Sequence, residues 1–311
     1  MKVGVSSCLL GQPVRFDGGH KRHEFVVELL GPFVDYVPVC PEIELGLGAP
    51  RDTLRLVRRG DDLRMVMANG ADYTDDMRAY ARRRVEKLAG DDLDGYILKR
   101  DSPSCGMERV KVHAAAGPAA RTGRGLFAEA LMTRLPLLPV EEEGRLSDPA
   151  LRENFIERLF AYRRLKDLFL GRWTAGALVA FHTAHKLVLL AHSPEAYRRL
   201  GRLIAGVKHE RRAEMRASYE EQFMRALAVV STRARHANVL QHMAGYFRDR
   251  LPADSRHELG DAIDEYRRGH LPLIVPITLV KHHVRVLDAG YLAGQIYLQP
   301  HPRELMLRNH V

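Results

Sequence analysis

Three short apolar runs in the first third of the chain each lead directly into a turn that carries a cysteine. The runs and their turns are Val3–Val5 before Ser6-Ser7-Cys8, Phe33–Val39 before Cys40-Pro41-Glu42, and Tyr96–Leu98 before Asp101–Gly106, which contains Cys105. A helical pattern over Asp75–Leu88 separates the last two runs, and this alternation is typical of an α/β fold with a mostly parallel sheet. Parallel strands end at one edge of a sheet, where such folds place their ligands, so we expect the three thiols to converge at the carboxyl edge.

The chain has only three cysteines, Cys8, Cys40 and Cys105. An odd number of widely spaced cysteines argues against a disulfide framework and leaves buried structural thiols, a nucleophile or metal ligands as alternatives. Small and rigid residues surround each one, in V-S-S-C-L-L-G, P-V-C-P-E and S-P-S-C-G, and such residues shape loops around ligands. Iron–sulfur clusters are held by cysteine thiolates, and three cysteines on a four-iron cluster leave one iron open to a substrate atom.

With 311 residues and 46% hydrophobic composition, the chain is long enough for two globular domains. The proline- and acid-rich stretch Leu135–Ser147 is predicted to be the linker, and Asp148-Pro149 supplies an N-cap and a first residue for a helix. Helical patterns follow, with apolar residues three or four apart at Phe155, Leu159, Tyr162, Leu165 and Phe169, a start at Ser193-Pro194, and further segments at Arg211–Ala228, Ala234–Arg248 and Arg256–Arg267. The prediction is an α/β domain over residues 1–145 and a mostly α-helical domain over residues 146–311.

The net charge of +9 lies entirely in the second half of the chain. Residues 1–150 carry 22 basic and 23 acidic residues, whereas residues 151–311 carry 26 and 16, a net charge of +10. This asymmetry suggests a polyanionic partner, with nucleic acid the leading candidate, and a basic surface that only confers solubility is an equal alternative on charge alone. Twelve of the 15 histidines also follow residue 150, which suits a surface that contacts phosphates and bases. By residue chemistry, our candidates for RNA contact are His182, Lys186, Lys208, His242, Lys281 and His282.

Some features of the second half have two interpretations. His182 and His185 lie three apart on an expected helix, but no third ligand for a metal can be placed by spacing. The Tyr246-Phe247 pair and Tyr297 are either core aromatics or rings that stack on RNA bases. No apolar run resembles a signal peptide or reaches the roughly 20 residues of a membrane span, so we expect a cytoplasmic protein without a membrane partner. No oligomeric state is predicted.

Four motifs within residues 1 to about 140 resemble the thiouracil desulfidase (TudS-like) family. They are S-x-C-L-L-G at Ser6–Gly11, R-F-D-G at Arg15–Gly18, V-C-P-E with G-L-x-x-P-R at Val39–Glu42 and Gly46–Arg51, and K-x-x-S-P-S-C-G at Lys99–Gly106. The chain departs from the family at Glu44-Leu45, where single-domain members tend to carry glycines beside the cluster motif.

The resemblance implies a 4Fe-4S cluster bound by Cys8, Cys40 and Cys105, whose open iron takes the sulfur of a thiocarbonyl without net redox. It further implies that Glu42 activates water and that Ser102 donates a proton. The residues themselves leave two alternatives, because Glu42 could simply be a carboxylate at a helix N-terminus, and Ser104 could face the cluster as well as Ser102.

Several basic residues of the first domain are candidates for substrate binding. Arg15 and Arg51 could hold a phosphate or a base carbonyl, or could instead form salt bridges to Asp17 and Asp52. Lys99, just before the Cys105 loop, belongs to the same group. The segment Gly117–Gly125, with Arg121 and Arg124, looks like a phosphate-contacting loop, although it lacks the G-K-[ST] ending of a P-loop.

The second half resembles the YbgA-like domain over roughly residues 150–311. The motifs that carry this resemblance are Phe181–Lys186 with His192, Asn238–His242 through Phe247, and Leu279–His283 with Tyr291–Pro302. The fused arrangement is similar to tRNA 4-thiouridine desulfidases, and it implies a helical domain that helps to hold tRNA. The expected function is therefore a 4Fe-4S-dependent, non-redox conversion of 4-thiouridine in tRNA to uridine with release of sulfide. The alternatives are a desulfidase of free thiouracil or thiouridine monophosphate, and an iron–sulfur RNA-binding regulator without turnover.

Overall fold

The computed structural model describes residues 1–114 and 117–311 and divides the chain into two units, Met1–Ser147 and Asp148–Val311. A four-stranded sheet, sheet A, lies at the centre of the first unit in the order β2-β1-β5-β8, and all its neighbouring strands are parallel. Its strands are β1 (Lys2–Ser6), β2 (Asp35–Val39), β5 (Gly95–Leu98) and β8 (Val140–Glu142). This confirms the predicted α/β fold with a mostly parallel sheet.

Strand β1 lies between β2 and β5, with Val5 paired to Pro38 on one side and to Ile97 on the other. The central strands β1 and β5 carry fully buried apolar side chains, including Val3, Val5 and Ile97. Gly4 is required at this crossing, because a Cβ there would overlap the buried ring of Tyr96. The three strands that precede the cysteine turns are therefore adjacent and end at the same edge.

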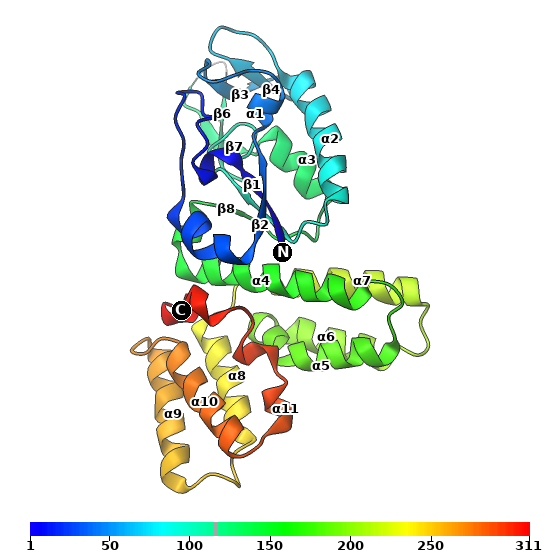
Figure 1. Ribbon diagram of the computed structural model, residues 1–311, viewed down its shortest axis with the longest axis vertical. Helices are drawn as coiled ribbons and strands as arrows, with labels where there is room; N and C mark the ends of the chain where they lie inside the picture. The colour runs from blue at the N-terminus through cyan, green and yellow to red at the C-terminus, as the bar shows by residue number, and fades with distance from the viewer. Residues whose placement is uncertain (115–116) are drawn as a thin grey trace. The chain divides into compact units, whose positions relative to one another are not determined.

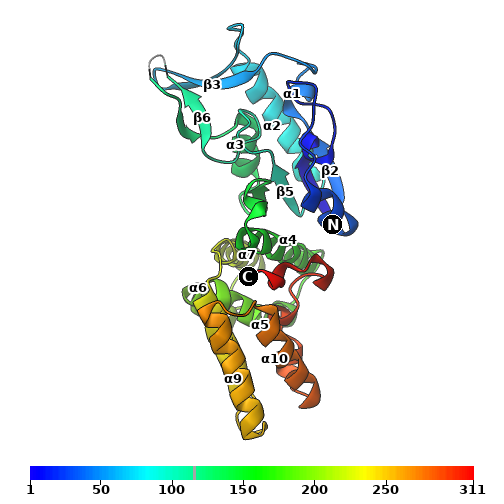
Figure 2. The ribbon, with the colours of Figure 1, turned by 90° about the vertical axis from the view of Figure 1, so that its left-hand side faces the viewer.

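A second sheet, sheet B, was not expected from the sequence. Its order is β4-β3-β6-β7, with antiparallel pairs at both ends and a parallel pair, β3 and β6, in the middle. The strands are β3 (Leu54–Arg59), β4 (Asp62–Met67), β6 (Val110–His113) and β7 (Ala120–Gly123). Figure 1 shows β1 and β2 running towards β3 and β4, and Figure 2 shows β3 and β6 side by side.

The structure corrects two sequence interpretations in this unit. Four of the nine residues of the segment Gly117–Gly125 do not form a loop, because Ala120–Gly123 is the edge strand β7. The stretch Leu135–Ser147 is not a linker, because it contains β8 and a buried run of three glutamates, Glu141–Glu143. Its acidic composition suggested a solvated segment, but each of these carboxylates has partners inside the fold.

The helices of the first unit are α1 (Pro41–Glu44), α2 (Thr74–Gly90) and α3 (Leu126–Arg134). Helices α2 and α3 pack against each other (Figure 1), and the buried ring of Phe127 lies between those of Tyr80 and Tyr96, with centroids 6.4 and 5.9 Å away. Gly125 precedes α3 at a point where a Cβ would overlap the backbone of Ser104. The start of α3 therefore packs directly against the loop that carries Cys105.

The second unit is helical, as predicted. Its helices are α4 (Pro149–Phe169), α5 (Ala175–His192), α6 (Pro194–Ala205), α7 (Arg212–Leu227), α8 (Arg233–Gly245), α9 (Ala253–Arg268), α10 (Ile274–Val286) and α11 (Gly290–Ala293). Helix α4 begins as the sequence indicated, since the Asp148 carboxylate accepts hydrogen bonds from the backbone N–H groups of Ala150 and Leu151. Among the described helices, none has both the length and the apolar character needed to span a bilayer.

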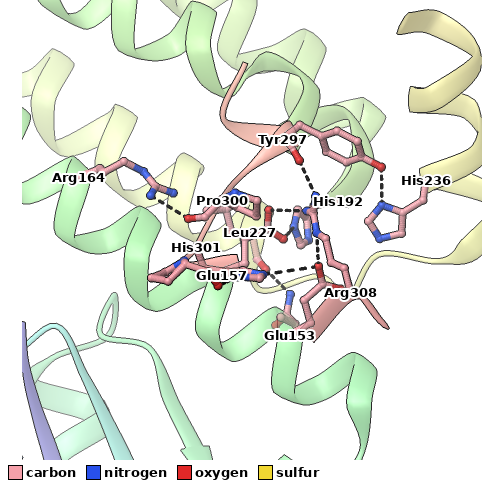
Figure 3. Close-up of polar contacts among 12 residues, drawn as sticks. Glu153, Glu157, Arg164, His192, Leu227, His236, Tyr297, Pro300, His301 and Arg308 are labelled. Carbon is pink, nitrogen blue, oxygen red and sulfur yellow. Dashed lines mark hydrogen bonds and ion pairs between the residues drawn. The ribbon is translucent and has the colours of Figure 1, made fainter. Parts of the chain in front are cut away.

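A buried polar cluster ties the C-terminal segment of this unit to α4, as Figure 3 shows. The Arg308 guanidinium donates to the Glu153 carboxylate at 2.6 Å and lies 3.7 Å from Glu157. His192 contacts Glu157 at 3.0 Å and the carbonyl of Val229 at 2.6 Å. Burial lowers the pKa of His192, but Glu157 outweighs that effect and leaves the pKa above its ordinary value.

The histidines of this unit do not form the surface that the sequence suggested. Six of the twelve are buried, namely His182, His185, His192, His236, His283 and His301. They complete internal hydrogen bonds, as in the contact of His236 Nδ1 with the Tyr297 hydroxyl at 2.9 Å. Composition alone could not separate these core histidines from exposed ones.

Candidate active site

The three cysteine-bearing turns line one cavity of about 310 Å³ at the carboxyl edge of sheet A. Cys8 lies in a short 3-10 helix, Ser7–Leu10, that directly follows β1. Cys40 is the N-cap of α1 after β2, and Cys105 lies in the loop that follows β5. Leu54 at the start of β3 and the preceding Thr53 also line the cavity. The expected convergence of the thiols is thus present.

Glu42 lies between two of these turns. One oxygen of its carboxylate is 3.5 Å from Cys40 Sγ, and the other is 3.5 Å from the Ser102 hydroxyl. The side chain is 8% exposed and lines the cavity. Glu42 does occupy the first turn of α1, but that helix has only four residues, so a helix dipole explains little of its position.

Ser102 and Ser104 take different positions in the Cys105 loop. The Ser102 hydroxyl accepts hydrogen bonds from the backbone N–H groups of Ser104 and Cys105, at 3.2 and 3.0 Å, and it lines the cavity. Ser104 is fully buried, and its hydroxyl has no hydrogen-bond partner among the described residues. The geometry therefore separates two serines that the sequence could not, and it favours Ser102.

Burial determines the protonation of the thiols. It raises the pKa of Cys8 to about 11 and that of Cys40 to about 12, and it raises the pKa of Cys105 well above its ordinary value. The Glu42 carboxylate adds to the effect at all three, while Lys99 opposes it at Cys8. A metal or cluster binds the thiolate form, so its binding would be coupled to loss of these protons.

The donor set fits an iron–sulfur cluster better than a single metal ion. Within the described residues, no group of three or more His, Cys, Asp or Glu side chains is arranged around one metal position. In a four-iron cluster each cysteine binds a different iron, so the thiolates need not meet at one point. Three thiols in one cavity, with no histidine in its lining, match that chemistry.

Comparison with known proteins gives matches for both units. Residues 3–143 match the family model for 2-thiouracil desulfurase, and residues 186–302 match a model for a protein family of unknown function, DUF1722. The uncharacterized protein YbgA of Escherichia coli (strain K12) is 36% identical over 155 residues, which are 49% of this chain and 90% of YbgA. The uncharacterized protein YbbK of Bacillus subtilis (strain 168) is 32% identical over 108 residues, 33% of this chain and 71% of YbbK.

Residues 3–143 belong to the 2-thiouracil desulfurase family, and the chain also carries a YbgA-like domain. A solved structure, described as a 4Fe-4S-dependent thiouracil desulfidase, TudS, is 31% identical in sequence. The alignment covers 50% of this chain and 99% of that chain, with a TM-score of 0.41.

Three basic residues of the desulfurase-family domain that were predicted to bind substrate line the cavity, namely Arg15, Arg51 and Lys99. Arg15 forms the salt bridge to Asp17 at 3.1 Å that the sequence offered as an alternative. Arg51 donates instead to the backbone carbonyls of Val14 and Gly48, at 3.0 and 2.7 Å. Lys99 pairs with Glu143. All three cations therefore have internal partners and still place positive charge beside the thiols.

Arg121 and Arg124, predicted to contact the substrate backbone, do not line the cavity. Arg121 pairs with Asp101 at 2.8 Å, and Arg124 donates to the carbonyl of Met107 at 2.8 Å. Both arginines lie at the outside of the Cys105 loop, and their contact with a substrate stays a prediction.

Two buried glutamates hold the two ends of the Cys105 loop, and neither was predicted from the sequence to be a site residue. Glu143 accepts a hydrogen bond from the backbone N–H of Arg100 at 2.7 Å, before Ser102. Glu142 accepts one from the backbone N–H of Met107 at 2.6 Å, just after Cys105. A signal was present in the sequence, because three successive acidic residues directly follow an apolar run at a strand position.

The candidate RNA contacts of the YbgA-like domain are dispersed. His182 is not available for RNA contact, because it is buried and its Nδ1 lies 3.2 Å from the Tyr219 hydroxyl. Lys281 is half-buried and lies 3.2 Å from the Gln299 side chain, and burial lowers its pKa. Lys186 is half-buried on α5, and Lys208 is exposed after α6. His242 and His282 are exposed on α8 and α10.

Proposed function

We propose that this protein is a 4Fe-4S-dependent desulfidase that converts 4-thiouridine in tRNA to uridine. The observation that carries the proposal is the position of Glu42, which links Cys40 to Ser102 inside a cavity lined by all three cysteines. A purely structural cluster needs neither a carboxylate nor a hydroxyl at this point. The match of residues 3–143 to the 2-thiouracil desulfurase family supports the reaction class.

Cys8, Cys40 and Cys105 would hold the cluster as thiolates. When bound, such a cluster supplies an iron without a protein ligand, which acts as a Lewis acid towards the sulfur of a thiocarbonyl. Lys99 and Arg51 contribute positive charge near Cys8 and Cys40, respectively, and so favour the thiolate forms.

Glu42 and Ser102 would handle the protons of the reaction. Replacing C=S by C=O consumes one water and releases sulfide, so no electrons are gained or lost. The Glu42 carboxylate is the base that takes a proton from this water. Two backbone N–H groups point at the Ser102 hydroxyl and favour negative charge on its oxygen, which makes Ser102 a better proton donor to the departing sulfur or the base nitrogen.

The charge distribution supports tRNA as the substrate. Residues 1–150 have a net charge of −1, whereas residues 151–311 have +10. A free base or nucleotide does not require a separate basic domain, but a polyanion gains affinity from one by releasing counterions. Free thiouracil and thiouridine monophosphate are the alternative substrates.

The test is a single-turnover incubation of anaerobically reconstituted protein with bulk bacterial tRNA. We expect 4-thiouridine to disappear in step with sulfide release, and we expect this activity to be lost in the apoprotein and in Cys105→Ser. Turnover of free thiouracil alone would reject the tRNA substrate. An iron-loaded protein that binds tRNA and leaves all thionucleosides intact would indicate a regulator instead.

A further inference from the structure

Two exposed tyrosines stack on each other at one end of the YbgA-like domain. Tyr246 directly follows α8 and Tyr291 lies in α11, and their ring centroids are 5.2 Å apart with 23° between the planes. The ring of His242, one turn earlier on α8, meets Tyr246 edge-on at 5.6 Å. Tyr246, Tyr291 and His242 are called the aromatic patch below.

The two tyrosines of the patch are exposed to solvent, whereas the neighbouring aromatic residues are buried. Tyr246 is 45% exposed and Tyr291 39%, whereas Phe247 and Tyr297 are fully buried. Among the described large apolar residues that are exposed, these are the only two tyrosines, and they touch although 45 positions separate them. The stacking of the two rings and the edge-on contact of His242 hold the pair in place. Because the rings are already fixed, a ligand that stacks on them pays little conformational entropy.

Charged residues differ between the surface near α11 and the groove between α9 and α10. Arg250, four residues after Tyr246, donates to the carbonyl of Leu287 at the turn that leads into α11, and Arg285 is exposed on the last turn of α10. The groove between α9 and α10 is lined instead by Glu258, Asp261 and Glu265. Figure 1 shows α9 and α11 on opposite sides of α8 and α10. The α9–α10 groove therefore disfavours a phosphate, whereas Arg250 and Arg285 place positive charge near α11.

We propose that the aromatic patch is a stacking platform for an unpaired base of the RNA substrate, with Arg250 beside it for the adjoining phosphate. The proposal rests on the tRNA substrate proposed above. Loops and ends of folded RNA present unstacked bases, and aromatic rings accept any base because every base has a π-face. The patch would thus add affinity for tRNA without reading its sequence.

The experiment compares tRNA affinity of iron-loaded, full-length variants by fluorescence anisotropy. We expect the double variant Tyr246→Ala/Tyr291→Ala to weaken binding about tenfold or more, with a parallel rise in KM for tRNA. The control Tyr246→Phe/Tyr291→Phe keeps both rings and should bind tRNA with the affinity of wild type. Emission from Trp173, the single tryptophan, checks that the domain remains folded in each variant.

A charge-matched pair separates a local site from general electrostatic attraction. Arg250→Gln should weaken binding, whereas Arg267→Gln on α9 removes the same charge on the acidic side and should not. Equal losses from both, or an unchanged affinity of the double alanine variant while wild type binds and desulfurates tRNA, would overturn the platform and leave the proposed function intact. A change of oligomeric state without a change in tRNA affinity would assign the patch to self-association. Failure of the wild-type protein to bind tRNA would overturn both proposals.

Discussion

The Ser102 hydroxyl lies 3.5 Å from the Glu42 carboxylate, although 60 residues separate the two in sequence. Glu42 enters from the turn after β2 and Ser102 from the loop after β5, on either side of β1. Sheet A therefore places the proposed acid–base pair by the same strand order that gathers the thiols. The contact predicts that chemistry and cluster binding can be separated by mutation.

Glu42→Gln should retain the cluster and lose turnover. The amide fills the same space but cannot take a proton from water, so kcat should fall by about 10²–10⁴-fold. Visible absorption and iron content should remain those of wild type. Glu44→Gln is the matched control. Glu44 lies on the same helix, but its carboxylate accepts hydrogen bonds from the Tyr80 hydroxyl and the Arg84 guanidinium. A Glu42→Gln enzyme with full activity would rule out Glu42 as the base.

Ser102→Ala and Ser104→Ala should differ sharply. Removing the Ser102 hydroxyl deletes the acceptor of two backbone N–H groups and the proton donor, so activity should fall strongly. Removing the Ser104 hydroxyl deletes a buried group without a hydrogen-bond partner, so the protein should be as stable as wild type or more stable. Turnover and urea unfolding measure the two effects. The opposite pattern would transfer the proton-donor role to Ser104.

Glu142→Ala should loosen the Cys105 loop and speed the loss of iron to a chelator. The substitution leaves the backbone N–H of Met107 without its acceptor, at a cost of about 1.5–3 kcal/mol for a bond to a charged group. Glu142→Gln keeps one acceptor oxygen and should restore most of the iron retention. If alanine and glutamine behave alike, the hydrogen bond does not hold the loop.

Arg308→Met should destabilise the YbgA-like domain by about 3–5 kcal/mol, because it leaves buried carboxylates without their cation. The control Arg303→Met removes an exposed arginine and should change stability by less than about 0.5 kcal/mol. Urea unfolding followed by Trp173 emission reports on this domain directly. Equal effects of the two substitutions would mean that the cluster in Figure 3 does not hold the C-terminal segment.

His236 should make this domain sensitive to acid. Burial lowers its pKa from 6.5 to about 4, so the unfolded chain binds a proton in this range and the folded domain does not. The contribution of His236 to stability is therefore fully present above pH 6.5 and is lost as the pH falls towards 4, with about 2 kcal/mol of it gone at pH 5. Because His182 and His185 also have lowered pKa values, His236→Gln should reduce, and not abolish, the dependence of unfolding free energy on pH between 6.5 and 4. An unchanged slope would show that other groups cause the acid sensitivity.

The sequence predicted those parts of the structure in which a local pattern and the fold agree. Val3–Val5 and Tyr96–Leu98 are apolar and central in sheet A, and Asp148 caps α4 as its position indicated. Sheet B was missed because its strands are half-exposed and rich in arginine, as in Leu54–Arg59, so no buried run marks them.

The errors arose where partners come from distant parts of the chain. Glu142 and Glu143 looked like linker residues because their hydrogen-bond donors lie 35 and 43 positions away. His182 looked available to RNA because its burial depends on Tyr219, on a helix two elements later. Ser102 and Ser104 differ only in which way the folded loop turns each side chain, and no local pattern records that.

The lining of the active-site cavity comes entirely from residues 6–105. The reaction centre is thus encoded in a contiguous segment of little more than a hundred amino acids, before the YbgA-like domain begins. Under the proposed function, the chemistry belongs to the first domain and the holding of tRNA to the second. An exchange of the second domain is then expected to change the substrate without altering a single residue that surrounds the reacting atoms.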